Sequence, residues 1–409
     1  TDEVAQLVLL DNYEQTQMLS LEASVSLQTI DLFRRYMNEL EKLGRLNRKL
    51  ESLPDEKNLL ERKAGGKGLT RPELAILLAY SKMFLKQDIL ATDIPEDPHF
   101  TKHLKMAFPT LLCEKFMDYI REHSLRREII ATQLGKSITD RMGINFIERL
   151  QRETGASVAS IIRAYTIAAT IFNLEVLWQQ IEDCDYKVKP AVQQKMMLQI
   201  YHLIRRATRW FLRSHASEID IEEGIQNFIK PISTLIQQIP DILEEQDKDY
   251  LENEIKNYVM ENVPASLAKS IATCPILFTS LDVVEASRRL KLPISDVATT
   301  YYLLGTQLDL NWLRDQMNHY PIENQWDELA RSGYRDDLDR AQRKLSLSVL
   351  SSKVKDKSIK HRIEVWMNEH AALINRWQNL LAEIKSSTNI NFVTFSVVMR
   401  ELMDFAQAG

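Results

Sequence analysis

At 409 residues the chain is long enough to hold two or three domains, each with a core of its own. Its 11 glycines and 12 prolines are about half of what average composition would give, so long helices are favoured over strands. The net charge of −5 is mild and gives no reason to expect nucleic acid or an anionic membrane as a partner.

Residues 1–64 form the first predicted segment, and two helices are expected in its first part. The second of these helices carries apolar residues at helical spacing: Leu32, Phe33, Tyr36, Met37, Leu40 and Leu43. Gly44 interrupts this pattern, and the later run Ala64-Gly65-Gly66-Lys67-Gly68 is predicted to be a loop.

The stretch Leu69–Lys82, with the sequence LTRPELAILLAYSK, contains the clearest helix start in the chain. Thr70 and Glu73 have the spacing of a capping box, and Pro72 stands in the first turn, where its missing N–H is no loss. The run Leu74–Tyr80 carries no charge. This run predicts a helix that is buried on all sides and around which the other helices pack.

Residues 69–215 are predicted to form a first helical lobe. Turns are indicated at 94–98, at Phe108-Pro109, at Gly143 and at Gly155. A long amphipathic helix is expected from Val188 onward, and its core face is marked by apolar residues: Met196, Met197, Ile200, Leu203, Ile204, Ala207, Trp210 and Phe211. The opposite face is predicted to carry His202, Arg205, Arg209 and Arg213.

Residues 216–263 read as an acidic helical connector that is broken at Pro231 and Pro240. Residues 264–409 are predicted to form a second helical lobe with a weak point at Ser346–Ser352. Beyond it, residues recur at alternating spacings of four and three: Ile359, Ile363, Trp366, His370, Leu373, Trp377, Leu380 and Ile384. This pattern predicts a heptad seam that packs against another helix.

An internal repeat relates Val158–Ile181 to Ile294–Met317, because the two stretches align without gaps. Five of 24 positions are identical: Tyr165/Tyr301, Thr170/Thr306, Leu174/Leu310, Leu177/Leu313 and Gln180/Gln316. Asn173 and Asp309 match as helix caps. We therefore predict two lobes related by duplication, although two unrelated amphipathic helix pairs could share as many identities by chance.

Two motifs invite a ligand-binding interpretation that the sequence does not sustain. Gly65-Gly66-Lys67-Gly68 lacks the first glycine and the final Ser or Thr of a phosphate-binding loop, and no strand precedes it, so a linker is expected. No G-x-G-x-x-G dinucleotide fingerprint occurs anywhere in the chain. His99 and His103, with Cys113 nearby, have no third ligand at a recognisable spacing, so no metal site is assigned.

A basic stripe, Arg205, Arg209 and Arg213, could bind nucleic acid or an anionic effector. We favour a solvated face, or one paired with the acidic stretch Glu218–Glu223. Leu281–Gly305 has the outline of a DNA-binding helix-turn-helix, but its second helix contains no Lys or Arg. That helix is expected to expose Tyr301, Tyr302 and Leu303 in a packed helical hairpin instead.

No catalytic set can be assembled from the spacing of Ser, His, Cys and acidic residues, so no catalytic, cofactor-binding or metal-binding residue is assigned. His370, in an otherwise apolar seam, is interpreted as a residue that fixes register. Cys113, Cys184 and Cys274 lie far apart, which fits a reducing cytoplasm. No apolar run is long enough to span a bilayer, and no signal peptide is recognised. Thr1, which is not an initiator Met, fits a piece cut from a longer protein.

Several long motifs together resemble one known family. They are TDEVAQLVLLDNYEQTQ at the start, LTRPELAILLAYSK, LRREIIATQLGKSITDRMGINFIERLQRETGAS (Leu125–Ser157), RRATRWFLR (Arg205–Arg213) and VVMRELMDF (Val397–Phe405). In this order they are similar to the region that follows the catalytic domain in the large bacterial NAD-specific glutamate dehydrogenases. The resemblance covers essentially the whole sequence.

The resemblance implies a C-terminal, non-catalytic helical region with a structural, assembly or regulatory role. The parent reaction would convert L-glutamate, NAD and water to 2-oxoglutarate, ammonium and NADH, with a lysine and an aspartate in an upstream cleft. NAD would be a cofactor of the parent, and none is expected to bind this fragment. The expected partners are the upstream catalytic domain of the same chain and further copies in a homo-oligomer, with neither nucleic acid nor membrane. The alternative is a stand-alone all-helical interaction scaffold without enzymatic activity, which composition and periodicity alone do not exclude.

Overall fold

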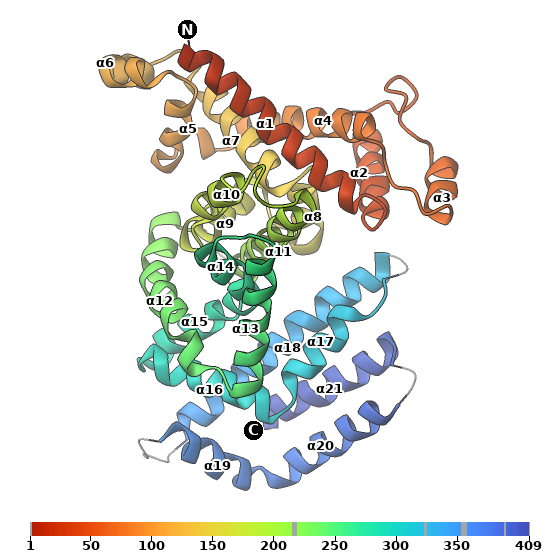
Figure 1. Ribbon diagram of the computed structural model, residues 1–409, viewed down its shortest axis with the longest axis vertical. Coiled ribbons are helices and arrows are strands. Elements are labelled where there is room, and N and C mark those ends of the chain that lie inside the picture. Colours follow the sequence, from red (N-terminus) through yellow and green to blue (C-terminus); the bar gives the residue numbers. More distant parts are fainter. Residues whose placement is uncertain (1, 215–218, 323–324, 353–357, 388–389, 409) are drawn as a thin grey trace. The chain divides into compact units, whose positions relative to one another are not determined.

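The computed structural model describes residues 2–214, 219–322, 325–352, 358–387 and 390–408. Within these ranges all regular elements are helices, which confirms the predicted all-α class (Figure 1). The contacts divide the chain into two compact units, Thr1–Ile225 and Gln226–Gly409. The finer division into 1–64, 69–215, 216–263 and 264–409 stays a prediction.

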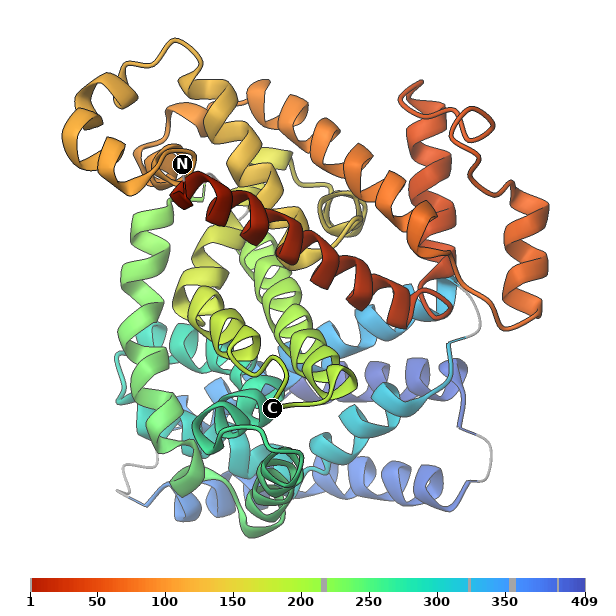
Figure 2. The same ribbon diagram turned by 45° about the horizontal axis from the view of Figure 1, so that its top comes forward.

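The first unit consists of helices that pack against one another along its whole length of chain. Its elements are α1 (Asp2–Val25), α2 (Ile30–Lys42), α3 (Glu56–Ala64), α4 (Arg71–Leu90), the 3₁₀ turns η1 (Ile94–Glu96) and η2 (Pro98–Phe100), α5 (Thr101–Met106), α6 (Thr110–Arg121), α7 (Arg126–Met142), α8 (Phe146–Thr154), α9 (Val158–Ile171), α10 (Leu174–Glu182) and α11 (Pro190–Ser214), and α12 (Ile221–Ile242) begins in it. Helix α4 packs against α7, α9 packs against α11, and α1 lies along α4 and α7, as Figure 2 shows.

Helix α4 begins as its sequence predicts. The Thr70 N–H donates to the Glu73 carboxylate at 2.7 Å, which completes a capping box. Leu77 is fully buried, but Ala75, Ala79 and Met83 are exposed, so the prediction that this helix is buried on all sides is wrong. The reason is that α1 and α7 cover only one side of α4, and alanine is small enough to be tolerated on the other.

A network of ion pairs fastens α1 to the body of the first unit. Arg141 of α7 reaches Glu14 of α1 at 2.9 Å and Glu182 of α10 at 2.7 Å. Lys136 of α7 pairs with Asp11 of α1 at 3.0 Å. It lies beside Asp140, which Lys82 of α4 contacts at 2.6 Å. Because most of these side chains are largely buried, the pairs hold α1 in one register more firmly than surface ion pairs would.

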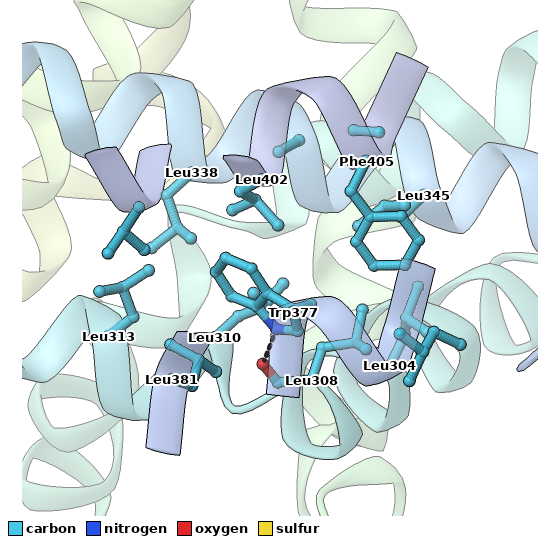
Figure 3. Packing of buried hydrophobic residues seen from close by; sticks show 14 of the residues in the cluster. Leu304, Leu308, Leu310, Leu313, Leu338, Leu345, Trp377, Leu381, Leu402 and Phe405 are labelled. Atoms are coloured by element: carbon cyan, nitrogen blue, oxygen red, sulfur yellow. Dashed lines mark hydrogen bonds between the residues drawn. The ribbon is translucent and has the colours of Figure 1, made fainter. Parts of the chain in front are cut away.

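The second unit has one large apolar core. Its helices, besides most of α12, are α13 (Glu245–Met260), α14 (Ala265–Leu277), α15 (Ser280–Leu290), α16 (Ile294–Gln307), α17 (Leu310–His319), α18 (Gln325–Ser351), α19 (Ile359–Glu369), α20 (Ala371–Ser386) and α21 (Phe392–Ala408). Figure 3 shows the Trp377 ring among leucines such as Leu310 and Leu402, with its indole N–H donating to the Leu308 carbonyl at 2.9 Å. The tryptophan thus fills an apolar core and still satisfies its polar atom.

The interruptions predicted at Pro231 and Pro240 are wrong, and the one predicted at Ser346–Ser352 comes only at the end of that stretch, where α18 ends at Ser351. Helix α12 runs through Pro231 and Pro240 without a break. Helix α18 runs through most of the serine-rich stretch, because the Ser346 hydroxyl donates to the Gln342 carbonyl at 2.8 Å within the helix and does not compete with it. The predicted heptad seam is divided at His370, the residue between α19 and α20.

Residues of the predicted seam are buried on both sides of His370. Its Nδ1 lies 2.8 Å from the Trp366 carbonyl oxygen, and its ring stacks on the Trp366 ring. Beyond His370 the predicted Trp377 and Ile384 are buried. Leu373 and Leu380 are only partly buried, next to the buried Ile374 and Leu381. His370 is a structural residue, as the sequence predicts, but it ends a helix and does not sit inside one.

The repeat predicted from sequence has matching local structure. Helices α9 and α16 have equal lengths and coincide in the alignment, and Asn173 and Asp309 both adopt the left-handed conformation, with φ of 52° and 56°, before α10 and α17. Left-handed Gly155 and Lys291 also correspond, just before α9 and α16. Neither Asn173 nor Asp309 caps its helix with its side chain. Their role is instead the positive φ that Asn and Asp tolerate. Duplication remains a prediction that these details support.

Candidate functional site

A pocket of about 450 Å³ lies in the first unit among α2, α4, α7 and α8. One part of its wall is apolar: Leu40, Leu43, Phe84, Leu85, Ile138 and Ile147. The other part carries ionisable side chains: Tyr36, Glu39, Arg45, Asp88, Glu148 and Arg152. This combination of an apolar wall with a few convergent charges is typical of sites that hold small molecules.

The charges in the pocket are only partly balanced by one another. Arg45 holds Asp88 with two hydrogen bonds of 2.8 and 3.3 Å, and its guanidinium lies 4.8 Å from the centre of the Phe84 ring. Arg152 reaches Glu148 through a single contact of 3.5 Å. Such a long contact between partly exposed groups contributes little, so Glu148 is weakly neutralised.

Glu148 is the most perturbed of the carboxyl groups that line the pocket. Burial, reinforced by the negative charge of Glu39, raises the pKa of Glu148 to about 7. Desolvation and a like charge both favour the neutral acid. The carboxyl is therefore poised between its charged and neutral forms near neutral pH, and a cation in the pocket would ionise it.

The basic stripe predicted on α11 does not form a solvated face. Arg205 and Arg209 are buried, and each reaches the Glu153 carboxylate of α8 at 3.3 Å, whereas Arg213 is exposed. Arg149 contacts the same carboxylate at 2.8 Å. Burial alone would raise the pKa of Glu153, but the three guanidiniums lower it to about 2.

This cluster was not recognised from the sequence, which pointed to the acidic stretch after α11; Glu218 lies outside the described residues. The spacing of Arg149 and Glu153, four apart in one helix, was the available signal. The cluster locks α8 to α11. Because its positive charges already face a buried carboxylate, nucleic-acid binding by this stripe is not supported.

The helix-turn-helix outline and the glycine-rich loop both take part in packing. Tyr301, Tyr302 and Leu303 are buried, so the prediction that α16 exposes them is wrong, and α15 and α16 form the packed hairpin that was expected. The glycine loop lies between α3 and α4, and Gly68 passes so close to the turn after α1 that a Cβ atom there would lie 2.6 Å from the Leu27 nitrogen.

The two histidines have different environments. His99 lies 3.3 Å from Asp97 and 3.2 Å from Glu222, whereas His103 is buried beside Phe100. Burial and the charge of Lys102 lower the pKa of His103 to about 3, so it is neutral. In the part of the chain that the structure describes, no three His, Cys, Asp or Glu side chains come together in a way that could hold a metal ion.

Two bent helix pairs have the length and apolar composition of a membrane span, although no single helix does among the described residues. They are Val158–Ile171 with Leu174–Glu182, bent by 65°, and Ala265–Leu277 with Ser280–Leu290, bent by 61°. Both pairs contribute many buried side chains to the units described above, which is also the behaviour of core helices.

Comparison with known proteins identifies the family. The family model described as glutamate dehydrogenase, C-terminal, matches residues 66–404. The NAD-specific glutamate dehydrogenases of Pseudomonas aeruginosa and Halomonas elongata are 39% and 38% identical over all 409 residues. That of Mycobacterium tuberculosis is 31% identical over 402 residues, 98% of the chain.

The matched region is a minor part of each relative. The chain spans 25% of the length of each of these three enzymes, so three quarters of their length have no counterpart in it. The family match covers the Glu153 cluster, most of both units and the part of the pocket wall that comes from α4, α7 and α8. It begins after α1, α2 and α3, so the pocket residues between Tyr36 and Arg45 lie outside it. The chain belongs to the glutamate dehydrogenase C-terminal family.

Proposed function

We propose that this chain is the C-terminal, non-catalytic region of an NAD-specific glutamate dehydrogenase, and that it supports the enzyme through docking and assembly. The relatives with that name contain about three times as much additional sequence, which is ample room for a separate catalytic domain. The buried side chains described above pack against one another or form ion pairs, such as those of Glu153. The observation that carries the proposal is an exposed apolar surface at one end of the first unit.

This surface, which we call the α1/α6 surface, is formed by the first turns of α1 and by the region around α6 (Figure 1). Its exposed apolar side chains are Val4, Val8, Leu9, Leu10, Met106, Leu111, Leu112, Phe116, Tyr119 and Leu125. Only Ile120 is buried among the twelve residues of α6. Isolated exposed leucines are normal, but a group of this size marks an interaction site.

Two acidic side chains of α1 fix the position of the α1/α6 surface. The Glu3 carboxylate accepts a hydrogen bond from the Thr110 N–H at 2.5 Å, which joins the starts of α1 and α6. Further along α1, Glu14 is anchored by Arg141. A surface prepared in this way loses little conformational entropy when it docks. Each leucine that becomes fully buried contributes about 1.5–3 kcal/mol.

The partner that we assign to the α1/α6 surface is the catalytic part of the same enzyme. The activity of that enzyme would be the oxidation of L-glutamate with NAD and water to 2-oxoglutarate, ammonium and NADH. We place NAD and the catalytic residues outside these 409 residues, and we expect a cytoplasmic homo-oligomer. The cysteines of this chain, Cys113, Cys184 and Cys274, are all free thiols, which fits a reducing compartment.

The proposal is tested by two assays on the same set of proteins. The 409-residue chain, incubated with glutamate and NAD, should produce no NADH. In a full-length enzyme that carries this sequence, Val8→Asp and Phe116→Asp should weaken assembly and lower activity. The matched control, Leu60→Asp on α3, replaces a side chain that is 50% exposed outside the surface and should have little effect. NADH formation by the chain alone, or equal effects of all three variants, would refute the proposal.

A further inference from the structure

We propose that the pocket among α2, α4, α7 and α8 binds a small organic cation, a primary ammonium group carried on an apolar or aromatic body. This inference goes beyond the docking role proposed above, because the pocket lies apart from the α1/α6 surface residues. It rests on the balance of charges, the shape of the wall and the position of Glu148.

The balance of charges favours a cation. Arg45 and Asp88 neutralise each other through two hydrogen bonds, so neither is free to hold a charged ligand. The remaining lining charges are Glu39 and Glu148 against Arg152 alone. Since Arg152 makes only the 3.5 Å contact with Glu148, the pocket has a negative surplus that an ammonium group would neutralise.

Glu39 has no strong partner of its own in the pocket. Its contact with Lys42, at 3.6 Å, is an exposed pair of neighbouring turns on α2, and such pairs contribute little. Glu39 and Glu148 therefore approach from α2 and α8 with like charges. An ammonium group with three N–H donors can serve two carboxylates at once.

The body of the ligand would lie against the apolar part of the wall. Leu40 and Leu43 come from the end of α2, and Phe84 comes from the middle of α4. The Arg45 guanidinium already lies over the Phe84 ring at 4.8 Å, so Phe84 contributes apolar wall to the pocket and the carboxylates remain the partners for the ammonium group. A pocket of about 450 Å³ is in the lower part of the range for small-molecule sites, which favours a compact ligand.

Binding should depend on pH through Glu148. Burial and Glu39 raise the pKa of Glu148 to about 7, so a bound cation would have to displace a proton below that pH. The other ionisable groups that line the pocket or act on this carboxyl are Tyr36 and Glu39 of α2, Arg45, Asp88 of α4, and Arg149, Arg152 and Glu153 of α8. The lining residues of α7, Ile138 and Thr139, do not titrate. Affinity for the cation should therefore rise as the pH rises through 7.

The test is calorimetric titration of the 409-residue chain with 2-phenylethylammonium as the probe, with 2-phenylethanol and 3-phenylpropionate as neutral and anionic counterparts. The ammonium probe should bind, and its two counterparts should bind at least about tenfold more weakly. Glu148→Gln and Glu39→Gln should each weaken the probe about tenfold, and Glu148→Gln should remove the pH dependence. Glu96→Gln, which removes an exposed carboxylate paired with Arg127, is the matched control and should change nothing.

Equal binding of the three probes, no binding of the ammonium probe, or unchanged binding to both pocket variants would overturn the proposal. Glu39 is 44% exposed, so Glu39→Gln provides a folded variant even if Glu148→Gln does not fold. Neither pocket variant touches the α1/α6 surface, so a failure here leaves the docking proposal intact, and a failure of docking leaves the ligand titration unaffected.

Discussion

Removal of the Glu153 charge should destabilise the first unit more than any exposed charge substitution. The Glu153 side chain is only 6% exposed and contacts Arg149, Arg205 and Arg209. In Glu153→Gln the three guanidiniums would face one another without their common carboxylate. Breaking a buried ion pair in this way costs about 3–5 kcal/mol, because the remaining charges stay buried and uncompensated.

The stability that Glu153 contributes should depend on pH. The pKa of Glu153 is lowered to about 2 in the folded chain from its ordinary 4.5. The carboxylate therefore stabilises the fold fully above pH 4.5, and this contribution is lost as the pH falls from 4.5 toward 2. Glu153→Gln should lack this acid-dependent component while the native chain shows it.

Hydrogen exchange of α8 and α11 measures the effect locally, which matters because a chain with two units need not unfold in a single transition. Exchange there should accelerate by about two to four orders of magnitude for a loss of 3–5 kcal/mol if it proceeds through unfolding of the unit. Glu96→Gln, whose side chain is 45% exposed and paired at 2.8 Å, is the control and should cost about 0–1 kcal/mol. Equal effects of the two substitutions would refute the assignment of Glu153 as the centre of a buried cluster.

Three further substitutions test other parts of the fold. Leu77→Ala should cost about 2–5 kcal/mol in urea unfolding, whereas Met83→Ala on the exposed side of α4 should change stability by less than about 0.5 kcal/mol, and equal costs would contradict the burial of one side only. Gly68→Ala should cost about 1–3 kcal/mol because the new Cβ would crowd the Leu27 nitrogen, and a neutral result in thermal unfolding would mean that the turn is free to move. The pKa of His103 falls to about 3 from 6.5, so stability should decrease as the pH falls from 6.5 toward 3; His103→Gln should flatten this slope, and an unchanged slope would show that other groups cause it.

Local signals in the sequence predicted the helices well. The capping box of Thr70 and Glu73 is present, and helices α7 and α8 end at Gly143 and Gly155, where turns are predicted. These features depend on interactions within a few residues, which a sequence displays directly. The family resemblance, carried by long motifs, is confirmed by the relatives.

Features that depend on the surroundings of a helix were harder to predict. The arginines of α11 were assigned to a solvated face, because nothing near them in the sequence shows that Glu153 lies beneath them. Pro231 and Pro240 were expected to break a helix that runs through both positions, so local propensity was overridden. The pocket could not be predicted at all, since Glu39 and Glu148 come together only when α2 and α8 pack in one unit.

The central claim, that this region docks through the α1/α6 surface, is tested most directly by hydrogen exchange on two samples. One sample is the 409-residue chain, and the other is a full-length glutamate dehydrogenase that carries the same sequence. We predict that the first turns of α1 and the whole of α6 exchange more slowly in the full-length enzyme, while α3 exchanges at the same rate in both. Equal exchange of α1 and α6 in the two samples would contradict the claim.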